Sequence, residues 1–515
     1  MSENHQNQIT ELPYSYHTFL LAFHFDGTFD DRRTGNWKHY SMRDDSYEEV
    51  KYKYQIYQYF NTDARKLMFD DESNPRFVYD IPEHLSREYV ITKGAETYTL
   101  HIDNIKAFVS KHNIAIIQFD LENHEADPDR RNLSYVNRIN EYGRRIILPF
   151  VVDEGAFHPL VADSVTILGH RVIFDKYGKE SIKNYRNEND KDNIIYPVLR
   201  LIRELLPDCR NISPIIDDRM FVCCMVRDEA LSKKIETKKT VETGDGKEIT
   251  VDVRDDIFCD ETLSNELYAF AFIDAGDSTC QDPVMRESIL RRCVYGRWRD
   301  WGTIDIITHH SFIRLTGESK GIVDSVINPF LLQYITMAAG VLLQRATILQ
   351  LSGECTEISE KYFDNKNPTR RSLKQVNEEI KTLKREYVYA QNTVFLEQFT
   401  VQEQGVDEFS MMKRELNIDD SLERLEQKIN SLYEYTEEYS EEQENKLLNL
   451  IAYIGLPLAL INLIVDMVGL PVFGENSCMF FLTSPLAVGA LVLSVGIVVY
   501  AVVRLLVFYI HGKDK

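Results

Sequence analysis

The sequence predicts an α/β (or α+β) N-terminal domain, a long helical stalk and two transmembrane helices near the C-terminal end. Three observations lead to this architecture. Short β-branched and aromatic runs alternate with helical stretches as far as about residue 320. Segments with a 3.6-residue hydrophobic period follow, and two long apolar runs come last. We therefore divide the chain into a cytoplasmic sensor domain (1–320), a stalk (321–446), a first membrane helix (447–470), an external loop (471–484), a second membrane helix (485–510) and a tail (511–515).

Strands of the N-terminal domain are expected at apolar, β-branched runs bounded by turn residues. These runs cover 18–25, 89–92, 98–101, 114–121, 145–151, 165–174, 220–226, 267–273, 303–308 and 311–315. Helical stretches at 105–112 and 130–142 lie between them, and GDGKE within 238–254 predicts a hairpin turn. We find no phosphate loop, nucleophile elbow or zinc-protease motif, so we do not expect an enzyme.

Three long helices are expected in the stalk, over 323–351, over 371–404, and from Asp407 into the first membrane segment. In the last of them, mostly apolar and aromatic residues repeat at spacings of four and three, which is the pattern of a heptad seam packed against neighbouring helices. They are Ile418, Leu422, Leu425, Ile429, Leu432, Thr436 and Tyr439. No proline lies between Pro368 and Pro457, so we expect one unbroken helix of about 60 residues, about 90 Å long.

The two apolar runs at 447–470 and 485–510 predict membrane spans. At about 1.5 Å per residue, each can cross a hydrocarbon layer of about 30 Å. The loop between them has no basic residue, whereas Lys446, Lys513 and Lys515 lie at the opposite ends of the spans, with Arg504 nearby. By the positive-inside rule we expect a multi-pass membrane protein with both termini in the cytoplasm.

A second stripe on the first membrane helix predicts the lining of a pore. Its members recur every three or four residues and pass from acidic, through small and apolar, back to acidic. They are Glu434, Glu438, Glu441, Asn445, Leu448, Ala452, Leu456, Ala459, Leu463 and Asp466, with Asn462 beside them. A carboxylate inside a membrane is costly unless it faces water or a partner, so Asp466 favours a pore. The alternative is a helix-packing face with a solvated acidic end.

The order of these parts resembles the CorA family of divalent-cation channels. The likeness covers residues 370–515, in which a stalk helix continues into the first span and a short loop, a second span and a basic tail follow. The sequence NLIAYIGLPLALINLIVDMVG, from Asn449 to Gly469, is similar in pattern to the family's first membrane helix, with Pro457 at the corresponding place. Membership implies a homopentamer in the bacterial inner membrane, with the first spans around the pore.

Two features set the chain apart from ordinary members of that family. Asp466, Met467 and Val468 stand where the family has a Gly-Met-Asn sequence that holds hydrated magnesium, and the cytoplasmic domain is enlarged. A ring of Asp466 carboxylates would still attract cations, so Asp466 is the expected metal-binding residue. In these respects the chain resembles the CorA-like membrane effectors of type III CRISPR systems. That resemblance implies antiviral defence, in which an S-adenosylmethionine–AMP conjugate acts as second messenger and opens or disrupts the membrane.

The segment 268–316 contains the residues that we expect to bind such a messenger. Arg297, Trp298 and Trp301 combine guanidinium and indole groups, which suit a phosphate and an adenine ring. A second set follows a predicted strand end and consists of Asp274, Asp277 and Gln281. The alternative is that the two tryptophans anchor the core or a subunit interface.

Charge excludes one class of partner, because 59 basic and 81 acidic residues give a net charge of −22 that repels nucleic-acid phosphates. The expected partners are other copies of the chain, the lipid bilayer and a small nucleotide. No cofactor is expected apart from Mg²⁺ or another divalent cation as the transported ion. The leading hypothesis is a homopentameric, ligand-gated cation channel. The alternatives are a magnesium or divalent-metal transporter and a cytoplasmic enzyme anchored by two spans.

Overall fold

The computed structural model of the chain divides into two compact units. It describes residues 12–27, 36–40, 47–69, 76–110, 113–147, 161–185, 196–206, 209–242, 248–252, 257–276, 278–318, 322–363 and 370–468, and isolated positions between 485 and 503. The first unit is Met1–Glu360 with Thr382–Gln427, and the second is Lys361–Lys381 with Lys428–Lys515.

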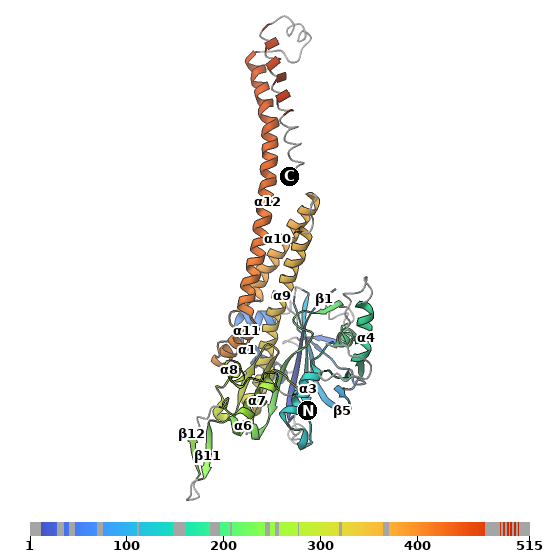
Figure 1. Ribbon diagram of the computed structural model, residues 1–515, viewed down its shortest axis with the longest axis vertical. Coiled ribbons are helices and arrows are strands. Elements are labelled where there is room, and N and C mark those ends of the chain that lie inside the picture. Colours follow the sequence, from blue (N-terminus) through green and yellow to red (C-terminus); the bar gives the residue numbers. More distant parts are fainter. Residues whose placement is uncertain are drawn as a thin grey trace. The chain divides into compact units, whose positions relative to one another are not determined.

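Most strands of the first unit form one large mixed sheet (Figure 1). Its order is β13-β14-β15-β10-β1-β6-β5-β4-β7-β8, while β9 pairs with β1, β3 pairs with β5, and β2 pairs with β3. Of the described pairs, β10 with β15 is parallel and the others are antiparallel. The strands are β1 (Ser15–Asp26), β2 (Trp37–His39), β3 (Arg76–Tyr79), β4 (Glu88–Lys93), β5 (Glu96–Val109), β6 (Ile114–Asn123), β7 (Ser164–Ile167), β8 (His170–Ile173), β9 (Arg210–Pro214), β10 (Phe221–Arg227), β13 (Val294–Tyr295), β14 (Ile304–Ile307) and β15 (Ser311–Thr316).

Helices pack against this sheet and at its β13–β15 end. They are α1 (Tyr47–Tyr59), α2 (Thr62–Phe69), α3 (Leu133–Gly143), α4 (Phe174–Tyr185), α5 (Pro197–Leu205), α6 (Glu229–Ile235), α7 (Glu261–Ala271) and α8 (Pro283–Cys293), with short 3₁₀ turns η1 (Pro128–Arg130) and η2 (Arg299–Trp301). Asn132, Asp228, Asp260 and Asp282 cap the starts of α3, α6, α7 and α8, because each side chain accepts a backbone N–H of the first turn. α6 and α7 contact β15, and α8 contacts β14. The predicted mixture of strands and helices is confirmed.

Two of the predicted elements have the wrong type. Residues 105–112 were expected to be helical, but β5 continues to Val109. A register shift between Ile102 and Asn104 moves the alternation of buried and exposed side chains by one residue. The sequence of this single strand therefore does not alternate regularly between apolar and polar residues. Residues 267–273 were expected to be a strand but mostly belong to α7, because the cap at Asp260 starts a helix whose buried end is a continuous apolar run.

Two further predicted strands are also revised. Residues 165–174 form the hairpin of β7 and β8 instead of one strand. Within 145–151, Arg145 makes an isolated bridge with Arg219, and 148–151 lie outside the described residues. The predicted hairpin at 238–254 is confirmed by the pairing of β11 (Lys238–Glu242) with β12 (Glu248–Asp252).

The helical part begins with two π-helical turns and is more interrupted than the sequence predicted. Its elements are η3 (Val323–Ile327), η4 (Phe330–Tyr334), α9 (Ile335–Phe363), α10 (Arg370–Thr393), α11 (Glu403–Glu415) and α12 (Ile418–Val468). The helix expected to run unbroken from Asp407 is divided at Asn417, whose φ of 51° is left-handed. Asn tolerates this conformation better than most residues do, so α11 ends there and α12 begins.

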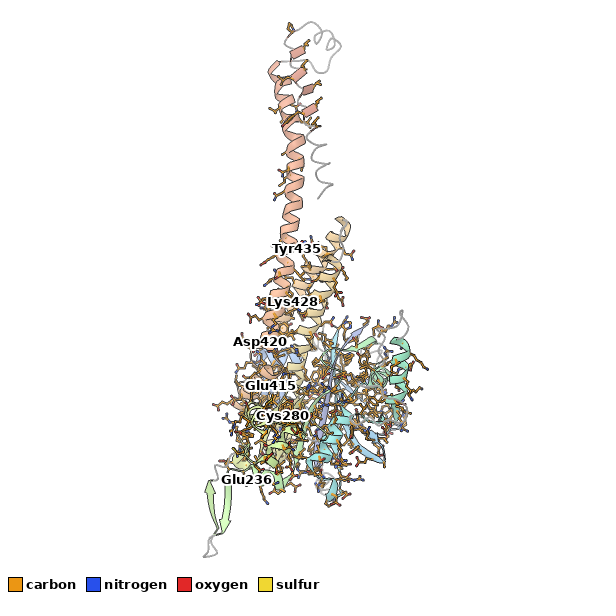
Figure 2. All side chains as sticks on the ribbon, viewed as in Figure 1. Glu236, Cys280, Glu415, Asp420, Lys428 and Tyr435 are labelled. Carbon is orange, nitrogen blue, oxygen red and sulfur yellow. The ribbon has the colours of Figure 1, made fainter. Side chains whose placement is uncertain are left out.

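α12 is a single helix of 51 residues. Figure 2 shows the side chains of Asp420, Lys428 and Tyr435 along its first half. On the predicted heptad seam, Leu425 and Ile429 are buried, whereas the side chains of Thr436 and Tyr439 lie outside the described residues. The seam therefore packs as predicted at the start of the helix.

In the described part of the chain, one helical segment is long and apolar enough to span a membrane. It is Val323–Lys361, which has 39 residues; 67% of its most apolar stretch is buried, a degree of burial also typical of a core helix. The first predicted span is helical as far as Val468, and helical positions recur from Pro485 to Val503. Residues 469–484 and 511–515 lie outside the described residues, so the two predicted spans and the loop between them stay predictions.

Candidate ligand-binding cavity

A cavity of about 670 Å³ lies in the first unit. Its walls come from β1, β5 and β6, from β2 and β3, from α1, and from η4 with the turn before it. Cavities of this volume commonly hold cofactor-sized ligands. Because side chains alternate across a strand, β5 and β6 bury apolar residues on one face and present polar residues to the cavity on the other. Asp103, Lys106, Asp120 and Glu122 line it in this way.

Arg76 of β3 is the most buried cation of the cavity wall. Its side chain is only 6% exposed, and its guanidinium lies 4.5, 4.6 and 5.6 Å from the ring centroids of Tyr40, Phe108 and Phe69. Nε and Nη1 of Arg76 have no hydrogen-bond partner among the described residues. Burial lowers the pKa of Arg76, while Tyr40 and Asp120 act in the opposite direction. The three rings stabilise the cation by cation–π attraction, but they supply no full negative charge.

A second cation lies on the same aromatic ring. Lys53 of α1 places Nζ 4.4 Å from the centroid of Tyr40. Lys38, on β2, also lines the cavity and pairs with Asp80 at 2.7 Å on the exposed surface. This end of the cavity is therefore basic and aromatic.

The other end of the cavity is acidic. Thr18 of β1 and Lys106 of β5 both bond to Asp120, at 2.8 and 2.6 Å. Asp103 accepts a hydrogen bond from the uncharged amide of Asn104. Burial raises the pKa of Asp103, and the neighbouring carboxylate of Asp120 raises it further. One lysine thus lies among three carboxylates, since Glu122 is the next acidic lining residue along β6.

The helical wall of the cavity connects it to a buried ion-pair network. Leu331 and Leu332 of η4 line the cavity. In the same turn, the rings of Phe330 and Tyr334 lie 5.0 and 4.8 Å from the guanidinium of Arg314 on β15. π-helical turns frequently mark functional positions in helices. η4 therefore contacts both the cavity and Arg314.

Arg314 joins the sheet to α11. Its Nε and Nη2 bond to the two oxygens of Asp305 on β14 at 2.6 and 2.8 Å, and Nη2 also lies 3.4 Å from Oε1 of Glu408 on α11. These side chains are between 0 and 4% exposed. Burial and the charge of Asp305 raise the pKa of Glu408 well above its ordinary value, although Arg314 lowers it. The pKa shift therefore favours the neutral form of Glu408 beside the Arg314–Asp305 ion pair.

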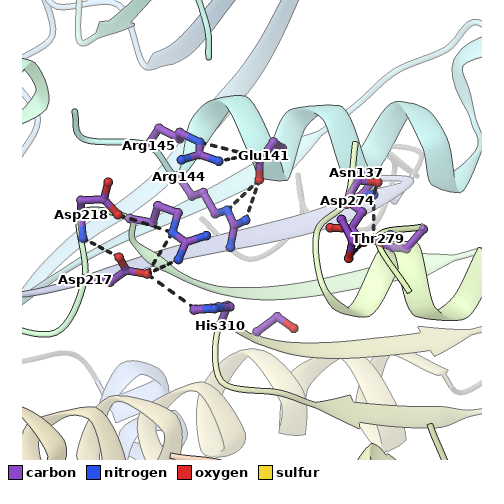
Figure 3. Close-up of polar contacts among 12 residues, drawn as sticks. Asn137, Glu141, Arg144, Arg145, Asp217, Asp218, Asp274, Thr279 and His310 are labelled. Carbon is purple, nitrogen blue, oxygen red and sulfur yellow. Dashed lines mark hydrogen bonds and ion pairs between the residues drawn. The ribbon is translucent and has the colours of Figure 1, made fainter. Parts of the chain in front are cut away.

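A separate polar network surrounds the end of α3 (Figure 3). Glu141 forms ion pairs with both Arg144 and Arg145, and the Arg144 pair measures 2.6 Å. Arg144 and Glu141 are each 2% exposed. This cluster fixes the chain after α3, because its opposite charges neutralise each other without solvent.

Asp217 and Asp218 lie beside this network (Figure 3). Arg219 approaches Asp217 at 2.7 Å and Asp218 at 3.5 Å, and His310 lies 3.6 Å from Asp217. Burial first, and then Asp217, raise the pKa of Asp218 to about 6, whereas burial and Arg219 lower that of His310 to about 4. The adjoining cavity of about 20 Å³ suits a water molecule and not a nucleotide.

The residues predicted to bind the messenger occupy two separate structural contexts. Asp274 accepts hydrogen bonds from N and Oγ1 of Thr279 at 2.9 and 2.7 Å, and its carbonyl accepts one from Asn137 of α3 (Figure 3). Gln281 donates to the carbonyl of Ser278 at 2.7 Å. Asp277 lies outside the described residues.

The second predicted set faces α11. Arg297 pairs with Glu403 at 2.6 Å and with Asp407 at 3.5 Å. Trp298 and Trp301 have ring centroids 5.9 Å apart and are 38% and 66% exposed. Among the described residues, no hydrogen bond or ion pair joins this set to Asp274 or Gln281. Their role in ligand binding stays a prediction.

Several residues of the predicted pore stripe are exposed on α12. They are Asn445, Leu448, Ala452, Ala459 and Asn462. The side chains of Glu438, Glu441, Leu456, Leu463 and Asp466 lie outside the described residues, so the stripe stays a prediction. The described residues contain no cluster of three or more His, Cys, Asp or Glu side chains able to hold a metal ion.

The cavity is marked by no motif in the sequence. Arg76, Lys53 and Glu122 come from three distant segments and belong to no motif. The sequence contains one indication of the cavity. Polar residues recur along 101–106 and 118–122, in strands that lie at the centre of the sheet. Polar side chains at such positions indicate that a cavity, and not packed core, covers that face.

The comparisons with known proteins leave the family open. No protein-family model and no curated protein matches the chain. A solved structure described as that of the full-length CmaX protein is similar over 39% of this chain and 67% of that chain, with 16% identity and a TM-score of 0.16. So low a TM-score does not establish a common fold, and the CorA resemblance stays a prediction from the sequence.

Proposed function

We propose that the chain is a CorA-like homopentameric membrane channel that opens when a ligand binds its cytoplasmic domain. The observation that carries this proposal is the change of character along α12. Ile418 and Leu425 at its start are buried, whereas Leu448, Ile451 and Leu458 are 61, 56 and 54% exposed. A long helix that exposes large apolar side chains in this way needs a membrane or other copies of the chain to cover them.

The conducted species in this proposal is a cation. The first-span helices of five copies would surround the pore, with the ring of Asp466 carboxylates near its outer mouth and an apolar constriction formed by Leu448, Leu456 and Leu463. A magnesium or divalent-metal transporter is the alternative within this class. It predicts ion flux without a messenger.

Antiviral defence is the biological setting that we propose, with the S-adenosylmethionine–AMP conjugate as activating ligand. This part rests on the sequence resemblance to CorA-like effectors of type III CRISPR systems. The cavity of about 670 Å³ supports it by offering a ligand site whose η4 wall adjoins the helical part of the chain. Opening would permeabilise the bacterial inner membrane.

The decisive experiment is a flux and reversal-potential measurement on the full-length protein in liposomes, with and without the conjugate. We expect conjugate-dependent cation flux, and Asp466→Asn should lose cation preference or conductance while ring assembly persists. Asp420→Asn, an exposed carboxylate at the start of the same helix, is the matched control and should behave as the parent. Unchanged reversal potential in Asp466→Asn would place this residue outside the pore, and absence of any flux would refute the channel.

A further inference from the structure

Two cations surround one aromatic ring at the basic end of the cavity. The guanidinium of Arg76 and Nζ of Lys53 lie 4.5 and 4.4 Å from the centroid of Tyr40. In the described part of the structure no carboxylate forms an ion pair with Arg76, and its Nε and Nη1 lack hydrogen-bond acceptors. A buried guanidinium without an anion is costly. An anionic group on a ligand would remove that cost, and a phosphate suits arginine best because its oxygens accept the parallel N–H groups.

Negative charge is in excess at the other end of the cavity. Lys106 is the cation that contacts Asp120 there, at 2.6 Å. Asp103 receives a neutral amide hydrogen bond from Asn104, and Glu122 contacts His124 at 2.9 Å. The carboxylates repel one another, since Asp120 and Glu122 both act to raise the pKa of Asp103. A cationic group on a ligand would relieve this repulsion.

The strand register separates these two ends. On β5, Phe108 is the partner of Arg76, whereas His101 is the partner of Glu122. At about 3.3 Å per residue, the two levels are roughly 20 Å apart along the strand. The cavity is therefore long and dipolar.

We propose that this cavity binds a phosphate ester that also carries a cationic group, with the phosphate at Arg76 and Lys53 and the cation beside Asp103 and Glu122. A purely anionic nucleotide would satisfy only the basic end, and a purely cationic ligand only the acidic end. The inference rests on the proposed function for its probe, because the S-adenosylmethionine–AMP conjugate joins a phosphate to a sulfonium and an amine. η4, which walls the cavity, is the element through which the bound ligand would reach Arg314.

The test is calorimetric titration of the full-length protein in detergent with the conjugate, with AMP and with S-adenosylmethionine. We expect the conjugate to bind at least about tenfold more tightly than either fragment. Arg76→Gln should weaken the conjugate and AMP at least about tenfold, and Arg76→Lys should weaken them less because it keeps the charge. Glu122→Gln should weaken the conjugate and S-adenosylmethionine but leave AMP unchanged. Lys179→Gln, an exposed lysine on α4 that pairs with Asp175, is the matched control for charge and should bind normally.

Arg76 is buried, so thermal unfolding of each variant must accompany the titrations. If Arg76→Gln does not fold, Lys53→Gln tests the same end of the cavity from α1 and should weaken AMP. Parent-like affinity in both Lys53→Gln and Glu122→Gln would overturn the assignment, as would failure of all three probes to bind the parent. Conjugate-dependent flux that survives these substitutions would refute the site and leave the channel intact. Binding of the conjugate in the cavity without any ion flux would refute the channel but support the binding site.

Discussion

The buried ion pair between Arg314 and Asp305 allows one substitution to be followed quantitatively. Arg314→Met keeps an unbranched side chain of similar length but removes the charge that faces Asp305, Glu408 and the rings of η4. Asp305 would then remain 1% exposed without its bidentate partner. Removal of one member of a buried ion pair costs about 3–5 kcal/mol, because the remaining charge loses both solvent and partner. We expect a loss of unfolding free energy of this order.

Glu408→Gln should behave differently, although it alters the same network. Burial and the charge of Asp305 raise the pKa of Glu408, which favours the neutral carboxyl, and an amide replaces that form with little change in charge. We expect Glu408→Gln to lower the unfolding free energy by at most about 1 kcal/mol, which is the contribution of one hydrogen bond.

The titration of Glu408 also makes the stability of the protein depend on pH. Below the ordinary carboxyl pKa, Glu408 is protonated in both the folded and the unfolded chain. As pH rises, the unfolded chain releases this proton first. The folded state therefore loses stability until the pH reaches the raised pKa of Glu408 in the folded chain. Glu408→Gln removes this group, and the variant should therefore lose less stability than the parent between weakly acidic and alkaline pH.

Thermal unfolding of the full-length protein in detergent, followed by circular dichroism over this pH range, measures both effects. Arg291→Met is the matched control, because Arg291 pairs with Glu287 on the surface of α8 and such pairs contribute at most about 1 kcal/mol. Parent-like unfolding of Arg314→Met, or equal destabilisation by Arg314→Met and Glu408→Gln, would refute this account of the network.

Three further predictions concern protonation, assembly and the ligand. Burial lowers the pKa of His17 to about 4, so stability should fall as pH drops from about 6.5 towards 4, and His17→Gln should flatten that fall in acid titrations followed by fluorescence. Native mass spectrometry should find a ring of five chains, and a monomer or dimer as the sole species would remove the pore. Arg297→Ala should keep conjugate affinity if the cavity is the site, whereas its loss with normal ring assembly would favour the cluster around Trp298 and Trp301.

The sequence by itself determined the elements whose signals are local. Strands such as β1 and β10 largely coincide with the mostly apolar runs 18–25 and 220–226, and the start of α12 carries a heptad pattern that is buried at Leu425 and Ile429. The apolar runs at 447–470 and 485–510, and the placement of Asp466 in the first of them, also follow from composition alone. These properties need no partner far away in the chain.

Tertiary structure decided the features that combine distant residues. A register shift in β5 turned an expected helix into a strand, and left-handed backbone at Asn417 divided an expected continuous helix. The cavity required β3, α1 and β6 to bring Arg76, Lys53 and Glu122 to one face of the sheet. Hydrophobic periodicity and composition describe residues that are close together in the sequence. This site depends instead on strand register and on which side chains remain without partners after the core has packed.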